Sequence, residues 1–297
     1  MSVIDLAVPR RRRQRAQSRR DPRVPPGRRV TLPDGSQTFV RIGGRPDGVP
    51  TLLLHGLGAT AALNWASCFP ELERRGPVIA LDHRGHGRGA RTGNGFRLEQ
   101  CADDAAAVLE ALGMGAAIVV GYSMGGPIAQ LLAKRHPHLV AGLVLSATAR
   151  DFRGAPADRL RFAALSVIAP ASELLPPLGA LPLPALPGPL RRLSWAVNEV
   201  RRHEAAAIVA ARELGRFTSR RWIHRLRVPT SVIVHTDDSV VPTRRQWKLA
   251  AAMPDVDTVE VAGDHLAVAN APETYVPALL QAHASVAERI GADAIAA

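Results

Sequence analysis

Short, almost continuously apolar runs alternate with amphipathic helical stretches along most of this chain. Runs such as TLLL, AIVV and VIV are typical of strands that are buried on both faces of a sheet. Helical patterns such as Leu98–Leu112 and Pro127–Arg135 lie between them, so we expect an α/β fold with a mostly parallel, doubly wound sheet. The turn signal Pro33-Asp34-Gly35-Ser36 predicts that this sheet begins with an antiparallel pair. The expected strands are Arg29–Leu32, Thr38–Ile42, Thr51–Leu54, Val78–Leu81, Ala117–Val120, Leu139–Leu145, Ser231–Val234 and Thr258–Val261.

One long stretch interrupts this alternation and divides the predicted core. The chain has 297 residues, enough for two average domains or for one large α/β domain with an insertion. Residues 151–225 begin with a stretch that holds eight prolines and continue into a helical pattern at Leu193–Phe217. Their many large apolar side chains argue against a disordered linker, so we expect a helical cap. Residues 29–150 and 226–297 then form the two parts of the core.

The positive charge of the chain is concentrated at its start. The chain carries 38 basic and 26 acidic residues, a net charge of +12, and ten of its arginines lie within residues 1–30 beside only Asp5 and Asp21. The run PRRRRQRAQSRRDPR has no apolar period, so residues 1–28 are predicted to be a disordered tail. A basic tail can contact nucleic acid or an anionic membrane, and the alternative is a solvated arm without a partner.

Composition also excludes several classes of protein. No apolar run reaches the roughly 18 residues of a membrane-spanning helix, and no apolar segment follows the arginines as it would in a secretory signal. The two cysteines, Cys68 and Cys101, are too few and too far apart for a zinc pattern or a disulfide framework. We therefore expect a cytoplasmic protein without a bound metal.

The sharpest chemical signal is Gly121-Tyr122-Ser123-Met124-Gly125-Gly126, which follows an apolar run and precedes a helical pattern. A strand, a turn of the form G-x-S-x-G and a helix are the context of a nucleophile elbow. The backbone at the tip of such a sharp turn is strained, and the residues two before and two after it must lack side chains. The pattern predicts that Ser123 projects above the end of its strand as a nucleophile.

A serine nucleophile needs a base and an orienting acid, and two later loops supply them in order. The first is His235-Thr236-Asp237-Asp238 after the run SVIV, and the second is Gly263-Asp264-His265 after TVEV. The order Ser, Asp, His places all three groups on loops at the same end of a parallel sheet. We assign His265 as the base and favour Asp238 as the acid. Asp237 remains an alternative, and Asp264 is expected to be a turn residue.

The loop after the third expected strand carries His55-Gly56-Leu57-Gly58. The oxyanion formed when a serine attacks a carbonyl needs N–H donors that are already in place. We expect the backbone N–H groups of Leu57 and Met124 to supply them. His55, Gly56 and Tyr122 are predicted to contact the substrate.

With these residues in view, the chain resembles the α/β-hydrolase fold serine hydrolases. The resemblance covers residues 28–290 apart from the insertion, and His235 departs from it because the family usually has Gly there. It implies an eight-stranded sheet, no cofactor, and cleavage of an ester or related acyl bond of a small molecule through an acyl-enzyme. Acyltransferases, carbon–carbon bond hydrolases and cofactor-free haloperoxidases of the same family are alternatives. The matching motifs are His55-Gly56, Asp82-His83-Arg84-Gly85-His86-Gly87, Gly121–Gly126, Asp238–Pro242 and Gly263–His265.

A nicotinamide oxidoreductase is a remote alternative. Gly56-x-Gly58-x-x-Ala61 followed by Asp82 is close to the dinucleotide fingerprint. That hypothesis leaves Ser123, Asp238 and His265 without a role. We also interpret His83-x-x-His86 as a structural loop rather than a metal pair.

The insertion bears on the substrate. It is rich in Leu, Ala and Pro and contains Trp195 and Trp222, which suggests an apolar acyl substrate. The alternative is that these side chains only hold the cap to the core.

Overall fold

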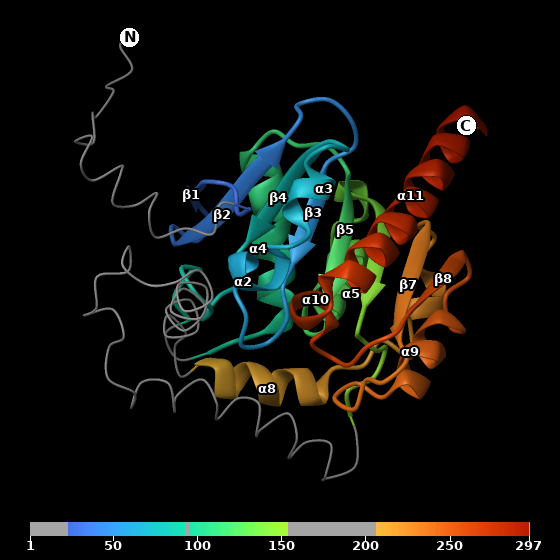
Figure 1. Ribbon diagram of the computed structural model, residues 1–297. Coiled ribbons are helices and arrows are strands. Elements are labelled where there is room, and N and C mark those ends of the chain that lie inside the picture. The colour runs from blue at the N-terminus through green and yellow to red at the C-terminus, as the bar shows by residue number, and fades with distance from the viewer. Residues whose placement is uncertain (1–22, 93–94, 154–205, 297) are drawn as a thin grey trace, which may run out of the picture.

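The computed structural model describes residues 23–92, 95–153 and 206–296, which form an eight-stranded sheet with helices on both faces (Figure 1). The spatial order is β1-β2-β4-β3-β5-β6-β7-β8. β1 pairs antiparallel with β2 and β2 with β4, while every later pairing is parallel. The strands are β1 (Gly27–Thr31), β2 (Gln37–Gly44), β3 (Thr51–Leu54), β4 (Pro77–Leu81), β5 (Ala117–Tyr122), β6 (Val140–Ser146), β7 (Thr230–His235) and β8 (Val256–Val261).

Each expected strand is present, and the α/β class and the antiparallel start of the sheet are confirmed. The predicted turn closes the β1–β2 hairpin: the Leu32 N–H donates to Ser36 O at 2.8 Å, and Gly35 has a φ of 79°. One boundary prediction is wrong, because Leu139 ends the short 3₁₀ helix η1 (Pro137–Leu139) and β6 begins only at Val140. The Leu139 N–H donates to His136 O at 3.0 Å, which commits it to that turn.

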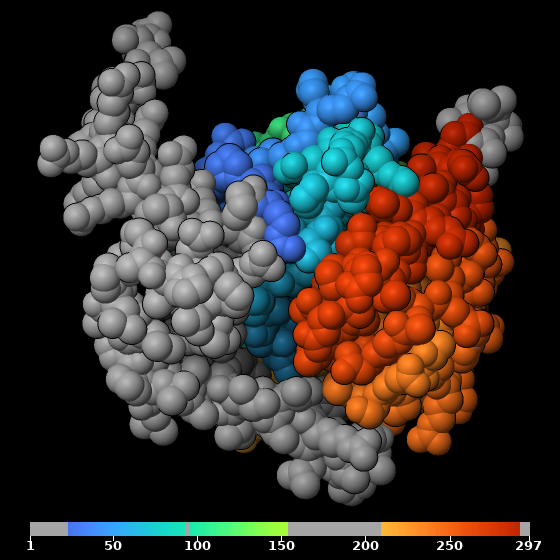
Figure 2. Space-filling model, in the orientation of Figure 1, coloured from blue at the N-terminus to red at the C-terminus, as the bar shows by residue number. Residues whose placement is uncertain are grey.

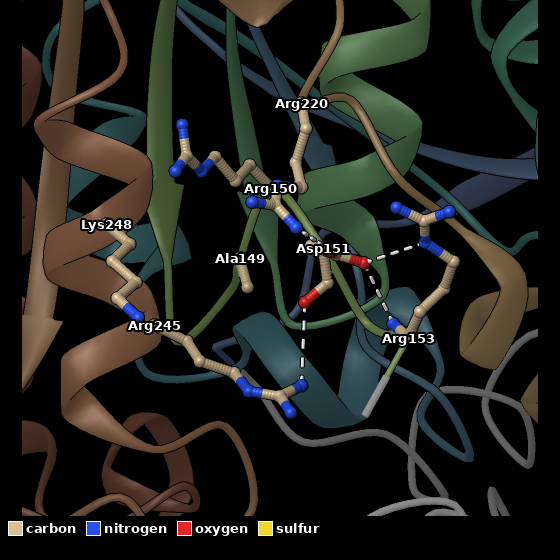
Figure 3. Close-up of a pocket in the computed structure, with 7 residues that line it drawn as sticks. All are labelled: Ala149, Arg150, Asp151, Arg153, Arg220, Arg245 and Lys248. Carbon is tan, nitrogen blue, oxygen red and sulfur yellow. Dashed lines mark hydrogen bonds and ion pairs between the residues drawn. The ribbon is translucent and has the colours of Figure 1, made fainter. Parts of the chain in front are cut away.

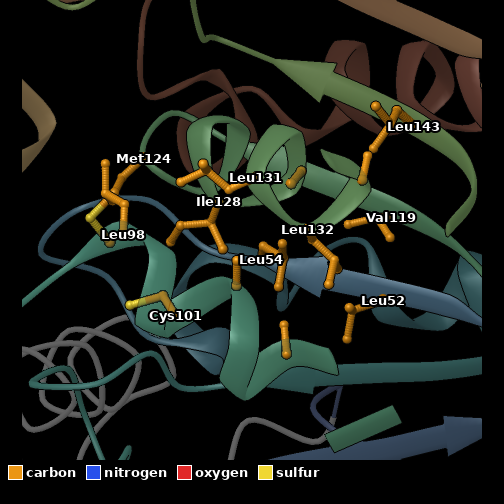
Figure 4. Packing of buried hydrophobic residues seen from close by; sticks show 14 of the residues in the cluster. Leu52, Leu54, Leu98, Cys101, Val119, Met124, Ile128, Leu131, Leu132 and Leu143 are labelled. Carbon is orange, nitrogen blue, oxygen red and sulfur yellow. The ribbon is translucent and has the colours of Figure 1, made fainter. Parts of the chain in front are cut away.

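The alternation of side chains along the strands builds one apolar cluster on each face of the sheet. Leu52 and Leu54 point into the cluster drawn in Figure 4, whereas Leu53 points into the other. The first cluster is covered by α4 (Leu98–Ala111), α5 (Gly125–Arg135), α8 (Ala206–Arg216) and α9 (Thr243–Ala250). The second is covered by α2 (Ala61–Trp65), α3 (Phe69–Leu72), α10 (Ala267–Asn270) and α11 (Pro272–Ala296). The long α11 covers much of the face seen in Figure 2.

The described part of the insertion is joined to the core at its two ends. A β-bridge pairs Asp151 with Thr218, and the Phe152 N–H donates to Phe217 O at 3.0 Å. α8 lies within the helical pattern expected at 193–217 and packs buried side chains into the first cluster, and the short η4 (Ile223–Arg225) follows it. Residues 154–205, including Trp195, lie outside the described residues, so the cap and its boundaries stay predictions.

The described structure begins after the predicted tail, and it includes both cysteines. Residues 1–22 lie outside the described residues. Arg23, the first described residue, donates from Nη1 to Ser67 Oγ at 3.1 Å. Cys68 and Cys101 are both free and fully buried. Within the described part of the chain, no helix has the length and apolar character to cross a membrane.

Candidate active site

Ser123 lies in a strained turn between β5 and α5, as the sequence predicts. Its φ of 52° is left-handed, a conformation that residues with a side chain rarely adopt. The turn is held by the Ser123 N–H, which donates to Ser146 O at 2.9 Å, and by Thr148 Oγ1, which donates to Ser123 O at 2.8 Å. A Cβ atom on Gly121 would lie 2.5 Å from Gly125 O, and one on Gly125 would lie 2.1 Å from Leu54 O. Both positions therefore require glycine for packing reasons.

The three residues predicted as nucleophile, base and acid meet in space. His265 Nε2 lies 3.0 Å from Ser123 Oγ, and His265 Nδ1 lies 2.8 Å from Asp238 Oδ2. Because a carboxylate can only accept, Nδ1 carries the proton, and Nε2 is left to accept from the serine hydroxyl. This is the tautomer that a general base next to a serine requires.

The carboxylate that contacts His265 belongs to Asp238 rather than to its neighbour Asp237. Asp238 Oδ1 accepts from the N–H groups of Val240 and Val241, both at 2.8 Å, and its side chain is fully buried. The Asp237 carboxylate is exposed and accepts from Thr236 Oγ1 at 2.8 Å. Asp264 accepts from the Leu266 N–H at 2.8 Å, which fits the turn role expected for it.

Gln246 is a site residue that the sequence interpretation missed. Its Nε2 donates to Asp238 Oδ2 at 3.0 Å and to Val241 O at 2.8 Å, and its Oε1 accepts from the His235 N–H at 3.0 Å. It is fully buried, and it lies on the same face of α9 as the buried residues Leu249 and Ala250. A polar residue on the apolar face of that helix was the available signal.

One predicted oxyanion donor, Met124, directly follows the serine, and the other, Leu57, lies in a loop that passes beside it. A Cβ atom on Gly56 would lie 3.3 Å from Ser123 Cβ, so the loop that carries Leu57 passes directly beside the nucleophile. Among the described residues, no hydrogen bond occupies the backbone N–H of Leu57 or of Met124. The Met124 side chain is fully buried in the first cluster (Figure 4).

Two of the residues predicted to contact the substrate, His55 and Tyr122, make hydrogen-bond contacts with other groups of the protein. His55 is fully buried, with Nδ1 at 2.8 Å from Gly56 O and Nε2 accepting from the His83 N–H at 3.0 Å. Burial raises the pKa of Tyr122, so its hydroxyl stays protonated and donates to His265 O at 2.7 Å. These contacts shape the loops around Ser123, and contact with substrate stays a prediction for His55, Gly56 and Tyr122.

A second serine–histidine pair lies beneath the first. His235 Nε2 is 3.0 Å from Ser146 Oγ, but its Nδ1 faces the carbonyl oxygen of Asp264 at 3.0 Å instead of a carboxylate. Burial lowers the pKa of His235, so the ring is neutral: Nδ1–H donates to Asp264 O and Nε2 accepts from Ser146. The Tyr275 hydroxyl lies 3.2 Å from Ser146 Oγ and completes this chain. Ser146 and His235 are fully buried, so this pair holds the segment before His265 rather than meeting a substrate.

Asp82 and the histidines that follow it are buried among other groups of the protein. Asp82 accepts from the N–H groups of Ala61 at 2.8 Å and Arg88 at 2.9 Å, so both carboxylate oxygens are already used. A dinucleotide site would need that carboxylate for a ribose hydroxyl. The rings of His83 and His86 are tilted against that of His55, with centroids 4.3 and 5.4 Å from it. The described residues contain no group of three or more His, Cys, Asp or Glu side chains that could hold a metal.

Comparison with known proteins places this geometry in a family. The family model for the alpha/beta hydrolase fold matches residues 50–272, about three quarters of the chain. The chain belongs to the α/β hydrolase fold family. A carbamate hydrolase, RutD, of Azorhizobium caulinodans is 31% identical over 245 residues, which are 78% of this chain and 90% of that relative. A poly(3-hydroxyalkanoate) depolymerase of Ectopseudomonas oleovorans is 26% identical over 80% of this chain and 85% of the relative.

Structural comparison agrees with this assignment. The crystal structure of a hydrolase from Pseudomonas aeruginosa PA01 matches 86% of this chain and 97% of its own with a TM-score of 0.71, and at 23% identity it supports the fold alone. Other α/β hydrolase relatives align over a smaller share of their own length. That share is 37% for a 2-hydroxymuconate semialdehyde hydrolase of Pseudomonas and 42% for a non-heme haloperoxidase of Rhodococcus erythropolis. With relatives that are hydrolases by name, this α/β hydrolase is an enzyme of the hydrolase type.

Proposed function

We propose that this α/β hydrolase is a serine hydrolase that cleaves a carboxylic ester or a related acyl bond through an acyl-enzyme on Ser123. The observation that carries the proposal is the continuous hydrogen-bonded series from Ser123 Oγ through His265 to Asp238, at 3.0 and 2.8 Å. Ser123 is only 5% exposed, so the reaction takes place in a nearly closed site.

In the first step the Ser123 hydroxyl attacks the carbonyl carbon while its proton passes to His265 Nε2. Asp238 stabilises the imidazolium, and the N–H groups of Leu57 and Met124 donate to the oxyanion. His265 then gives the proton to the departing alcohol, which leaves the acyl group on Ser123. A water molecule, deprotonated by His265, repeats the sequence and releases the acid.

An apolar acyl group fits the surroundings of His265. The next residue, Leu266, is a large apolar side chain that is 55% exposed. A single exposed leucine is common on protein surfaces, so Leu266 supports an alkyl substrate only through its place next to His265. A relative that is matched over 85% of its length and is named as a poly(3-hydroxyalkanoate) depolymerase is in keeping with an ester substrate.

A fluorophosphonate probe tests the nucleophile, because it reacts covalently with an activated serine. We expect labelling of the folded protein and its loss in Ser123→Ala. Ser146→Ala is the matched control, since Ser146 belongs to the other serine–histidine pair, and it should still be labelled. Labelling that survives in Ser123→Ala or disappears only in Ser146→Ala would overturn the proposal.

A chain-length series of p-nitrophenyl esters tests the bond and the substrate class. The expected result is turnover that rises from acetyl to octanoyl esters. A preference for acetyl would refute the apolar substrate and leave the ester chemistry intact. Probe labelling without turnover of any ester would point to the acyltransferase, carbon–carbon hydrolase or haloperoxidase alternatives.

A further inference from the structure

Five cationic side chains and one carboxylate line a hollow near the carboxyl end of β6 (Figure 3). The hollow has a volume of about 200 Å³, room for several water molecules at about 30 Å³ each. It is lined by Arg150, Asp151, Arg153, Arg220, Arg245 and Lys248.

Among the described residues, Asp151 is the one carboxylate that lines the hollow, and two of the arginines face it. Arg153 Nε lies 3.1 Å from Asp151 Oδ1, and Arg220 Nη1 lies 3.5 Å from Asp151 Oδ2. Arg245 Nη1 points to the backbone carbonyl of Asp151, at 3.5 Å. Within the described ranges, neither Arg150 nor Lys248 has an acidic partner. The hollow therefore keeps an excess of positive charge that a bound anion would neutralise.

The backbone holds these cations in place without any ligand. Asp151 and Thr218 form a β-bridge, and the Ser219 N–H donates to Arg150 O at 2.8 Å. Ser219 Oγ also donates to Gln130 Oε1 of α5 at 2.7 Å, and both side chains are fully buried. This pairing presents Arg150, Arg153 and Arg220 from one side, while α9 supplies Arg245 and Lys248 from another (Figure 3).

We propose that this hollow binds a phosphate group, either as free phosphate or as a phosphate monoester. Asp151 already faces Arg153 and Arg220, and the positive charges of Arg150 and Lys248 match the two negative charges of a phosphate better than the single charge of a second carboxylate. Guanidinium groups donate in pairs to the oxygens of a tetrahedral phosphate, and here they come from more than one direction.

Residues that line the hollow lie next along the chain to residues that hold the triad. Thr148, which holds the Ser123 carbonyl, is separated from Arg150 by one residue, and Gln246, which holds Asp238, is the neighbour of Arg245. A phosphate carried by the substrate would thus lie at the same end of the sheet as the reacting carbonyl. This part of the proposal rests on the proposed ester hydrolysis, whereas phosphate binding itself does not.

Binding is tested by titration calorimetry with inorganic phosphate on the full chain and on Ser123→Ala. We expect saturable binding in both proteins and a phosphate-dependent rise in melting temperature beyond that given by sodium chloride of equal ionic strength. Arg150→Gln and Lys248→Gln should each weaken phosphate binding about tenfold, since each removes a charge-assisted donor. Arg244→Gln is the control, because Arg244 lies on the same helix and is exposed outside the hollow; it should bind as the unaltered chain does.

The source of the phosphate is decided by a matched substrate pair, a butyryl ester of glycerol and one of glycerol phosphate. A higher kcat/KM for the phosphorylated ester, lost in Arg150→Gln with Lys248→Gln, assigns the hollow to the substrate. Equal kcat/KM values together with phosphate binding assign it to free phosphate. Absence of binding, or equal binding in the double variant, would overturn the proposal even if ester hydrolysis is confirmed. Binding to a protein that hydrolyses no ester would instead refute the proposed function alone.

Discussion

At the scale of single residues, the two aspartates after β7 differ sharply in what they touch. Asp238 accepts from His265 Nδ1 at 2.8 Å, whereas Asp237 is exposed. We expect Asp238→Asn to lower kcat by about 10³- to 10⁴-fold, because an amide at this position favours the wrong imidazole tautomer. Asp237→Asn, the matched control, should leave kcat close to its original value. Steady-state hydrolysis of a p-nitrophenyl ester measures both, and a large loss in Asp237→Asn would contradict the assignment.

His235 is the residue that departs from the family pattern, and its ring links two segments of the core by hydrogen bonds. It joins Ser146 to the carbonyl of Asp264, directly before His265. His235→Gly would leave these buried groups without partners, at a cost of about 1–3 kcal/mol in the free energy of unfolding. We expect kcat to fall more than KM rises, because the base loses its support rather than its contact with substrate. Urea unfolding and steady-state kinetics test this; an unchanged kcat in a destabilised protein would reduce His235 to a packing role.

Site residues could be predicted where the pattern that marks them lies in neighbouring residues, and could not where their partners are distant in sequence. The role of Ser123 could be predicted because the glycines that its sharp turn requires lie within five consecutive residues, Gly121–Gly125. The partners of His235 and Gln246 could not, because they lie on other strands and loops. Only the assembled sheet brings Ser146 of β6 beside β7, and only α9 turns Gln246 back toward Asp238.

At the scale of elements, the crossing of α5 over β3 depends on glycine. A Cβ atom on Gly125 would lie 2.1 Å from Leu54 O, and backbone cannot move aside as a flexible side chain can. We expect Gly125→Ala to destabilise the protein by about 3 kcal/mol or more, since overpacking forces backbone shifts. Gly215→Ala in α8 is the control, because nothing lies within 4 Å of the added atom and alanine favours a helix. Thermal unfolding measures both, and equal melting temperatures for the two variants would refute this account.

Elements also differed in how well the sequence predicted them. The strands were found because burial on both faces leaves runs such as Thr51–Leu54 without polar residues. The helices α2 and α3 are five and four residues long, too short to show a helical period. They are fixed instead by Thr60, whose hydroxyl accepts from the Leu63 N–H at 3.1 Å, and by packing of Phe69 and Leu72.

At the scale of the whole molecule, a buried histidine couples stability to pH. His283 of α11 lies 2.9 Å from Thr51 Oγ1 of β3, and burial, aided by the charge of Arg75, lowers the pKa of His283 to about 4. Between pH 6.5 and 4 the unfolded chain thus binds more protons at this site than the folded chain, so stability falls with acidification. From this group we expect a loss of about 2 kcal/mol between pH 7 and pH 5.

Urea unfolding at the two pH values, with His283→Gln as the comparison, measures that contribution. Glutamine can still hydrogen-bond to Thr51 but does not titrate, so the variant should lose less stability on acidification. The same acid-induced loss in both proteins would assign it to other groups. Burial also lowers the pKa of His83 and His235, so a residual pH dependence is expected in the variant.

The pairing of Phe152 with Phe217 divides the chain in a way that matters for its evolution. The two ends of the intervening stretch meet in a backbone hydrogen bond, and α8 at its end packs on the core, so the sheet and the triad loops are joined on either side of the rest of that stretch. The entropy of closing such a stretch depends only weakly on its length. The stretch between these ends and α8 can therefore change in length and sequence, so new substrate preferences could arise there while α8, Ser123, Asp238 and His265 remain untouched.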